Sequence, residues 1–193
     1  MTDGNSIMQV KGKALASIPK FVHKRFGKEG FERWLDAISV EAHELYLFPV
    51  DTDKWYPLKS CMIEPCANIA QLFFNWEMKE AAWEMGRFAA DYSLNQVMKF
   101  FTKMTPATFL AKKACDLFNE NYRPVNVELV DMELNSGIIR VTLFPEMDKS
   151  VEYRFAGRIE RTLEIHGGKN IKVEIPRSLT NFQAVTEFLV KWE

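Results

Sequence analysis

Residues 125–144 read VNVELVDMELNSGIIRVTLF, and this stretch predicts two paired β-strands. Apolar and polar side chains alternate over Val125–Met132 and again over Ile138–Phe144, which is typical of strands with one buried face. Asn135–Gly137 supplies turn-forming residues between them. We therefore expect an antiparallel hairpin here.

A helix and a second hairpin are expected after the first one. Apolar residues over Glu152–His166 recur at helical spacing, and Gly167–Gly168 ends the helix. Ile171–Ile175 and Val185–Trp192 again have the composition of strands. The C-terminal part thus predicts an antiparallel sheet of about four strands, with one helix between the hairpins.

The chain before residue 125 is predominantly helical in pattern. Apolar residues at helical spacing predict helices over 16–27, 28–38, 58–75, 77–91, 93–103 and 106–119, and Pro65 should kink the third of these or mark its start. Two short extended pieces are expected over 44–50 and 55–57, with a turn at 51–53. The fold class is therefore α+β, an N-terminal helical half packed on the sheet.

The composition suits one compact unit. The chain has 193 residues, 47% of them hydrophobic, and a net charge of -1. We expect a flexible tail over residues 1–8 and a single domain over 9–193. The balanced charge argues against a nucleic-acid partner. With neither an 18-residue apolar run nor an apolar leader, we expect no membrane span and a cytoplasmic location.

Few side chains suggest chemistry. The three histidines, His23, His43 and His166, match no metal-binding spacing, and the three cysteines are expected to be reduced and buried. Cys61 and Cys66 would point about 140° apart on a straight helix, which disfavours a shared metal. With no nucleophile–base pair and no phosphate loop visible, we expect a non-enzymatic protein without a metal site.

Large flat side chains are the unusual feature of the composition. The chain has 15 Phe, 5 Trp and 5 Tyr, many of them between residues 55 and 101. Such residues can enclose an apolar ligand pocket, although they also suit an ordinary core or a dimer interface. The candidates for lining a pocket are Trp55, Tyr56, Phe73, Trp76, Trp83 and Phe101.

Three segments in order resemble bacterial heme-nitric-oxide-binding domains. They are VKGKALASIPKFVHKRFGKEGFERWL (10–35), FFTKMTPATFLAKKA (100–114) and the closing stretch over 155–192. The closing stretch is equally similar to four-vinyl-reductase-type domains and to Golgi transport-particle subunits, which share the fold. With WYPL at 55–58 and MGRFAA at 85–90, the chain most resembles an uncharacterised bacterial family that is abundant in myxobacteria.

Departures from the heme-binding pattern shape the functional expectation. The family's iron ligand is a histidine on the helix before the T-P turn, but residues 80–105 contain none, and the family spacing leads to Leu94. The Tyr-x-Ser-x-Arg motif that holds the heme propionates is also missing. We therefore expect no histidine-ligated heme and no other cofactor, with Cys115 as a remote alternative ligand. By similarity to the transport-particle subunits, Cys61 or Cys66 is a candidate for acylation.

Two functions follow from this resemblance. The first is a heme-free sensory module that binds a hydrophobic small molecule in an apolar pocket and acts in bacterial signalling. The alternative is a scaffold that forms a homodimer, or binds a signalling partner, through a helical face without a ligand.

Overall fold

The computed structural model describes residues 7–93 and 107–193. The helix expected over 93–103, the candidate Phe101 and the first six residues of the expected tail lie outside this part. The helices are α1 (Gly12–Leu15), α2 (Ser17–Ala37), α3 (Val40–Leu47), the π-helical turn η1 (Lys59–Ile63), α4 (Glu64–Phe73), α5 (Met78–Ser93), α7 (Ala107–Asn121), α8 (Lys149–Ile165) and the short turn η2 (Leu179–Asn181). The strands are β1 (Gln9–Lys11), β2 (Trp55–Pro57), β3 (Tyr122–Arg123), β4 (Asn126–Met132), β5 (Ser136–Leu143), β6 (Lys172–Arg177) and β7 (Thr186–Lys191).

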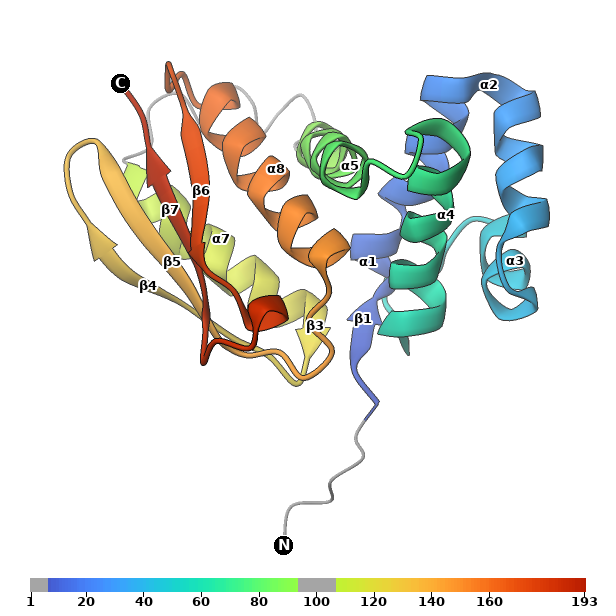
Figure 1. The fold of residues 1–193 in the computed structure, drawn as a ribbon, viewed down its shortest axis with the longest axis horizontal. Helices are drawn as coiled ribbons and strands as arrows, with labels where there is room; N and C mark the ends of the chain where they lie inside the picture. Colours follow the sequence, from blue (N-terminus) through green and yellow to red (C-terminus); the bar gives the residue numbers. More distant parts are fainter. Residues whose placement is uncertain (1–6, 94–106) are drawn as a thin grey trace, which may run out of the picture.

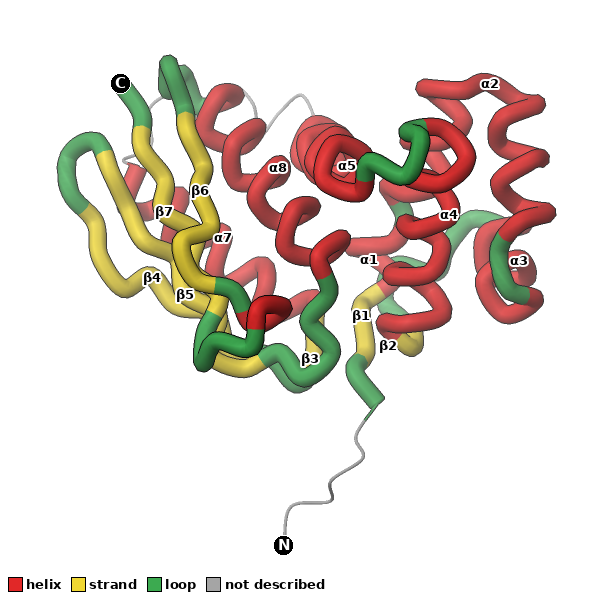
Figure 2. Tube along the Cα trace, in the orientation of Figure 1, coloured by secondary structure: helices red, strands yellow, loops and turns green. Residues whose placement is uncertain are grey.

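The α+β class and the four-stranded antiparallel sheet are confirmed. The strand order is β4-β5-β7-β6, so pairing of β5 with β7 joins the two predicted hairpins. Side chains of one face, among them Val127, Ile139 and Phe188, are buried. Helices α7 and α8 contact the sheet, α5 packs against α8, and α1 to α4 lie on the far side of α5 (Figure 1). The tube view shows the same division into a sheet side and a helical side (Figure 2).

A second, three-stranded sheet is an addition to the predicted layout. Strand β1 lies between β2 and β3, with Val10 opposite both Tyr56 and Tyr122. Met8, which we had assigned to the tail, is fully buried, and its amide donates to Glu146 Oε1 at 3.1 Å. The start of the described chain is thereby tied to both halves of the molecule.

The prediction of an extended piece over residues 44–50 is wrong for most of its length. Val40–Leu47 forms helix α3, whose N-cap Ser39 accepts a hydrogen bond from the Ala42 amide at 3.3 Å. Ala42 and Tyr46, one helical turn apart, are buried on the inner side. Capping and burial thus outweigh the strand-like local composition.

The other expected helices are confirmed where they are described. The predicted division of the first helical region lies at Gly27, whose φ of 72° and ψ of -170° interrupt α2. Pro65 lies in the first turn of α4, the position where proline is tolerated. No helix in residues 7–93 or 107–193 is long and apolar enough to cross a bilayer.

Helices α5 and α8 approach each other through two glycines. A Cβ on Gly86 would lie 2.1 Å from the Arg154 carbonyl oxygen, and one on Gly157 would lie 2.2 Å from that of Trp83. Ion pairs surround this contact: Arg87 binds Glu160 and Glu164, and Arg161 binds Asp91 at 3.1 Å. The α5–α8 contact therefore joins the helical half firmly to the sheet half.

Candidate functional site

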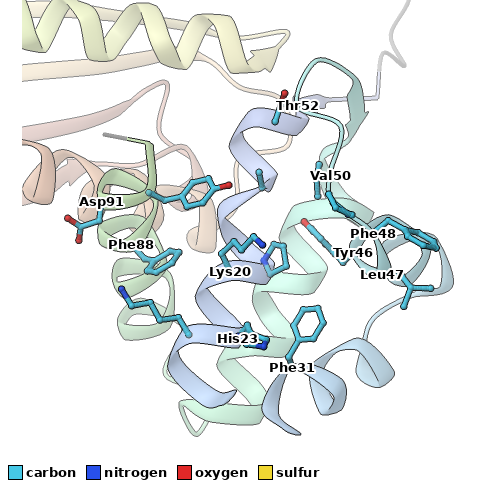
Figure 3. Close-up of a pocket in the computed structure, with 15 residues that line it drawn as sticks. Lys20, His23, Phe31, Tyr46, Leu47, Phe48, Val50, Thr52, Phe88 and Asp91 are labelled. Carbon is cyan, nitrogen blue, oxygen red and sulfur yellow. The ribbon is translucent and has the colours of Figure 1, made fainter. Parts of the chain in front are cut away.

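A cavity of about 990 Å³ lies in the helical half, between α2, α3 and α5 (Figure 3). This volume is at the upper end of the range typical of small-molecule sites. The lining residues come from both halves of α2 and the residue before it, the end of α3 with the loop that follows, and the last turns of α5. They are Ala16, Pro19, Lys20, His23, Lys24, Phe31, Tyr46, Leu47, Phe48, Pro49, Val50, Thr52, Phe88, Asp91 and Tyr92.

The loop after α3 is held in place by α1. The Lys13 amide donates to the Thr52 carbonyl at 3.0 Å, and the Gly12 amide donates to that of Lys54 at 2.8 Å. A Cβ on Gly12 would lie only 2.0 Å from the Asp51 carbonyl oxygen, so this approach requires a glycine. One wall of the cavity is thereby fixed by backbone contacts.

Aromatic rings form the opposing walls. Phe88 on α5 packs edge-on against Phe21 at 5.5 Å and stacks on Tyr92 at 6.4 Å between ring centroids. Phe31 on α2 contacts the His23 ring edge-on at 6.0 Å. Figure 3 shows Phe88 and Phe31 on different sides of the space. These contacts place apolar surface on both the α5 and α2 sides.

Tyr46 closes the inner end of the cavity. Its hydroxyl donates to the Cys61 carbonyl at 2.5 Å, and its side chain packs against Trp34. Burial, reinforced by the nearby thiols of Cys66 and Cys61, raises the pKa of Tyr46 well above its ordinary value. Tyr46 is therefore a neutral wall residue, because its proton is engaged in a buried hydrogen bond.

The five predicted pocket residues that the structure describes lie elsewhere. Trp55 and Tyr56 are neighbours on β2, where the Arg123 guanidinium lies 4.1 Å from the Trp55 ring centroid. Phe73 stacks on Phe26, Trp76 is 67% exposed, and the Trp83 indole donates to Glu160 at 2.8 Å. None of the five lines this cavity. Their role in binding a ligand stays a prediction.

Sequence reasoning missed the cavity because its lining carries little sequence signal. Residues such as Ala16, Pro19 and Thr52 are small, and Lys20 and Lys24 resemble the wet face of a helix. The many aromatic residues between 55 and 101 led us to expect the pocket in that region. The cavity instead depends on how α2 and α3 cross α5. Among the residues that line the cavity, Phe88 and Tyr92 are the two aromatic residues from the region 55–101.

The three cysteines are buried thiols, as expected. Burial raises the pKa of Cys61, Cys66 and Cys115 to about 11 in each case. A thiol with this pKa is protonated near neutral pH and is a weak nucleophile and metal ligand. In the part of the chain that the structure describes, no three His, Cys, Asp or Glu side chains gather in an arrangement suited to a metal ion.

Neither His166 nor His23 is placed as a heme ligand would be. His166 binds its own helix at Thr162, and His23, the histidine that lines the cavity, is exposed at its rim. A ligating histidine is normally oriented by a hydrogen bond from its second ring nitrogen. His23 has none within the described ranges, where its ring contacts Phe31 instead. The raised thiol pKa values disfavour a cysteine ligand, and the hydrogen bond of the Tyr46 hydroxyl disfavours a tyrosine ligand.

The fold is that of H-NOX proteins, as the resemblance led us to expect. The chain matches an H-NOX protein from S. oneidensis in the Fe(II)NO ligation state with a TM-score of 0.71, at 12% identity over 95% of this chain and 99% of that one. It matches the Fe(II) unliganded H-NOX protein from K. algicida with a TM-score of 0.67, at 11% identity over 95% and 96%. A T. tengcongensis H-NOX variant gives 0.63 at 12% identity over 95% and 97%.

No protein-family model and no curated protein sequence matches the chain. At 11–12% identity, the structural likeness concerns the fold.

Proposed function

We propose that the chain is a heme-free, non-enzymatic sensory module that binds a hydrophobic small molecule in the cavity between α2, α3 and α5 and acts in bacterial signalling. The observation that carries this proposal is the cavity itself, about 990 Å³ with aromatic rings on two sides. Residues 9–193 would act as one unit, because the α5–α8 contact joins the ligand site to the sheet.

The likeness to H-NOX proteins supports a sensory role, since those structures carry iron in defined ligation states. The donor set described above supports a ligand other than heme. In this proposal the signal arises from occupancy of the cavity, because a ligand that binds the folded state stabilises the elements that line it.

Native mass spectrometry of the freshly purified protein tests the proposal, together with an absorption scan. We expect a co-purified small molecule or a ligand-free chain that takes up an added hydrophobic probe, and no Soret band. A Soret band that survives gel filtration would overturn the heme-free proposal. Failure of every hydrophobic probe to bind would overturn ligand binding.

A second candidate function is a dimerising scaffold, and exposed apolar residues of α3 and its following loop favour it. Val40 is 75% exposed and Phe48 is 68% exposed. A homodimer, or a complex with a signalling partner, would cover them. The same mass spectra count subunits, and a chain that stays monomeric at high concentration would contradict the homodimer.

A further inference from the structure

Basic side chains outnumber acidic ones in the lining of the cavity. Lys20, His23 and Lys24 all lie on α2, within about one turn. Asp91 is the acidic residue of the lining, and it binds Arg161 of α8 at 3.1 Å. Figure 3 shows Lys20 directed into the space and the Asp91 carboxylate turned away from it. The Asp91 carboxylate is thus paired with Arg161 on the side that faces away from the cavity.

Neither lysine has a carboxylate at ion-pair distance among the residues that the structure places. Lys24 Nζ instead lies 5.7 Å from the centroid of the Phe88 ring. An ammonium group next to an aromatic wall combines a positive charge with apolar contact area. This pairing suits a ligand that has both a negative group and an apolar body.

A third positive charge lies behind the inner wall. Arg154 on α8 is 4% exposed and donates to the Ala14 carbonyl at 2.8 Å and to Ser17 Oγ at 3.0 Å. These two residues flank Ala16, which lines the cavity. The partners of Arg154 among the described residues are neutral, and its Nε has no hydrogen-bond partner there. Its charge therefore adds to a positive field at this end of the cavity.

We propose that the cavity selects an amphipathic anion, a molecule with an apolar chain or ring and one carboxylate. The carboxylate lies at Lys20 and Lys24, and the apolar part lies between Phe88 and Phe31. This inference rests on the proposed ligand-binding function and goes further by assigning the ligand's charge.

Calorimetric titration with three probes of equal chain length tests this assignment. Each probe is used below its critical micellar concentration. The probes are dodecanoate, dodecanol and dodecyltrimethylammonium. Two single variants, Lys20→Met and Lys24→Met, keep the apolar bulk of the side chain without its charge. Lys172→Met, on the exposed strand β6, is the matched control. We expect dodecanoate to bind most tightly, and each cavity variant to weaken it about tenfold, the effect of one charge-assisted hydrogen bond. The control should leave it unchanged.

The outcomes separate this inference from the proposed function. Equal binding of dodecanoate and dodecanol, unaffected by either cavity variant, would overturn the anion assignment and leave ligand binding intact. Tighter binding of the cationic probe would also overturn it. If none of the three probes binds the wild-type chain, both the assignment and the proposed function fail.

Discussion

Glu152 and Arg154 lie two residues apart on α8 and bind opposite parts of the molecule. Both are buried, at 2% and 4% exposure. Two residues correspond to about 200° around a helix, so their side chains leave α8 on nearly opposite sides. Glu152 accepts hydrogen bonds from the loop between β6 and β7, and Arg154 donates to the region where α1 meets α2. Helix α8 thus connects the sheet to the cavity wall.

Replacing Glu152 should destabilise the β6–β7 loop. Its carboxylate accepts hydrogen bonds from Ser178, Thr180 and Thr186, and Glu152→Gln replaces one acceptor oxygen with an amide donor. We expect a loss of about 1–3 kcal/mol in the free energy of unfolding. Urea denaturation measures it, with Glu174→Gln on exposed β6 as the control that should change little. Equal midpoints for the two variants would refute this role.

A methyl group at the α5–α8 crossing should be costly. In Gly86→Ala the new Cβ would start 2.1 Å from the Arg154 carbonyl, so the two helices must move apart. Overpacking of this kind typically costs about 1–3 kcal/mol. Gly157→Ala meets the Trp83 carbonyl and should behave alike. Thermal unfolding gives the comparison, and a wild-type midpoint in both variants would show that the contact is looser than described.

The ion pairs at this crossing predict a pH dependence. Hydrogen bonds from Arg87, followed by those from Arg161, lower the pKa of Glu164 below its ordinary 4.5. The folded state therefore binds fewer protons than the unfolded state in this range. The stabilisation is present above about pH 4.5 and is lost as the pH falls through the lowered pKa.

Glu164→Gln should remove this part of the acid sensitivity. Unfolding free energies measured at intervals between about pH 6 and pH 2 should fall more steeply in the wild type than in the variant. Parallel curves would mean that Glu164 gains nothing from its arginine partners in the folded state.

The buried thiols should resist modification in the folded protein. With a pKa of about 11 for Cys61, Cys66 and Cys115, the thiolate fraction at pH 8 is roughly one thousandth. We expect a disulfide reagent to react slowly in buffer and rapidly in denaturant. The absorbance of the thiolate that the reagent releases measures the rate. Rapid reaction of one equivalent in buffer would identify an accessible cysteine and would favour acylation at Cys61 or Cys66.

Secondary structure was predictable where one local pattern agreed with the tertiary packing. The strands around Asn135–Gly137 and the helix ending at Gly167 have clear periodicity, and both are confirmed. Helix α3 was mispredicted because its eight residues include strand formers, and its Ser39 cap carried the deciding information. Strand β1 has only three residues, too few for a periodic signal.

The candidate site was less predictable than the fold. The number of aromatic residues in a segment does not reveal where their side chains point. Trp76 is exposed to solvent, while the Trp83 indole donates to Glu160 on α8. The cavity depends on three elements meeting, among them α3, which was not expected as a helix. Lys20 and Lys24 acquire significance only once Phe88 is known to face them.

The central claim is that this cavity binds an apolar molecule, and the most direct test blocks it. Val50→Trp places a large ring in the lining, and Val130→Trp places the same ring on β4, where Val130 is 40% exposed. Thermal unfolding is measured with dodecanoate or dodecanol, whichever binds the wild type more tightly, at about 100 times its dissociation constant. We predict that the better-bound probe raises Tm by about 5–10 °C in the wild type and in Val130→Trp, with no rise in Val50→Trp. An equal rise in all three proteins, or none in the wild type, would contradict the account.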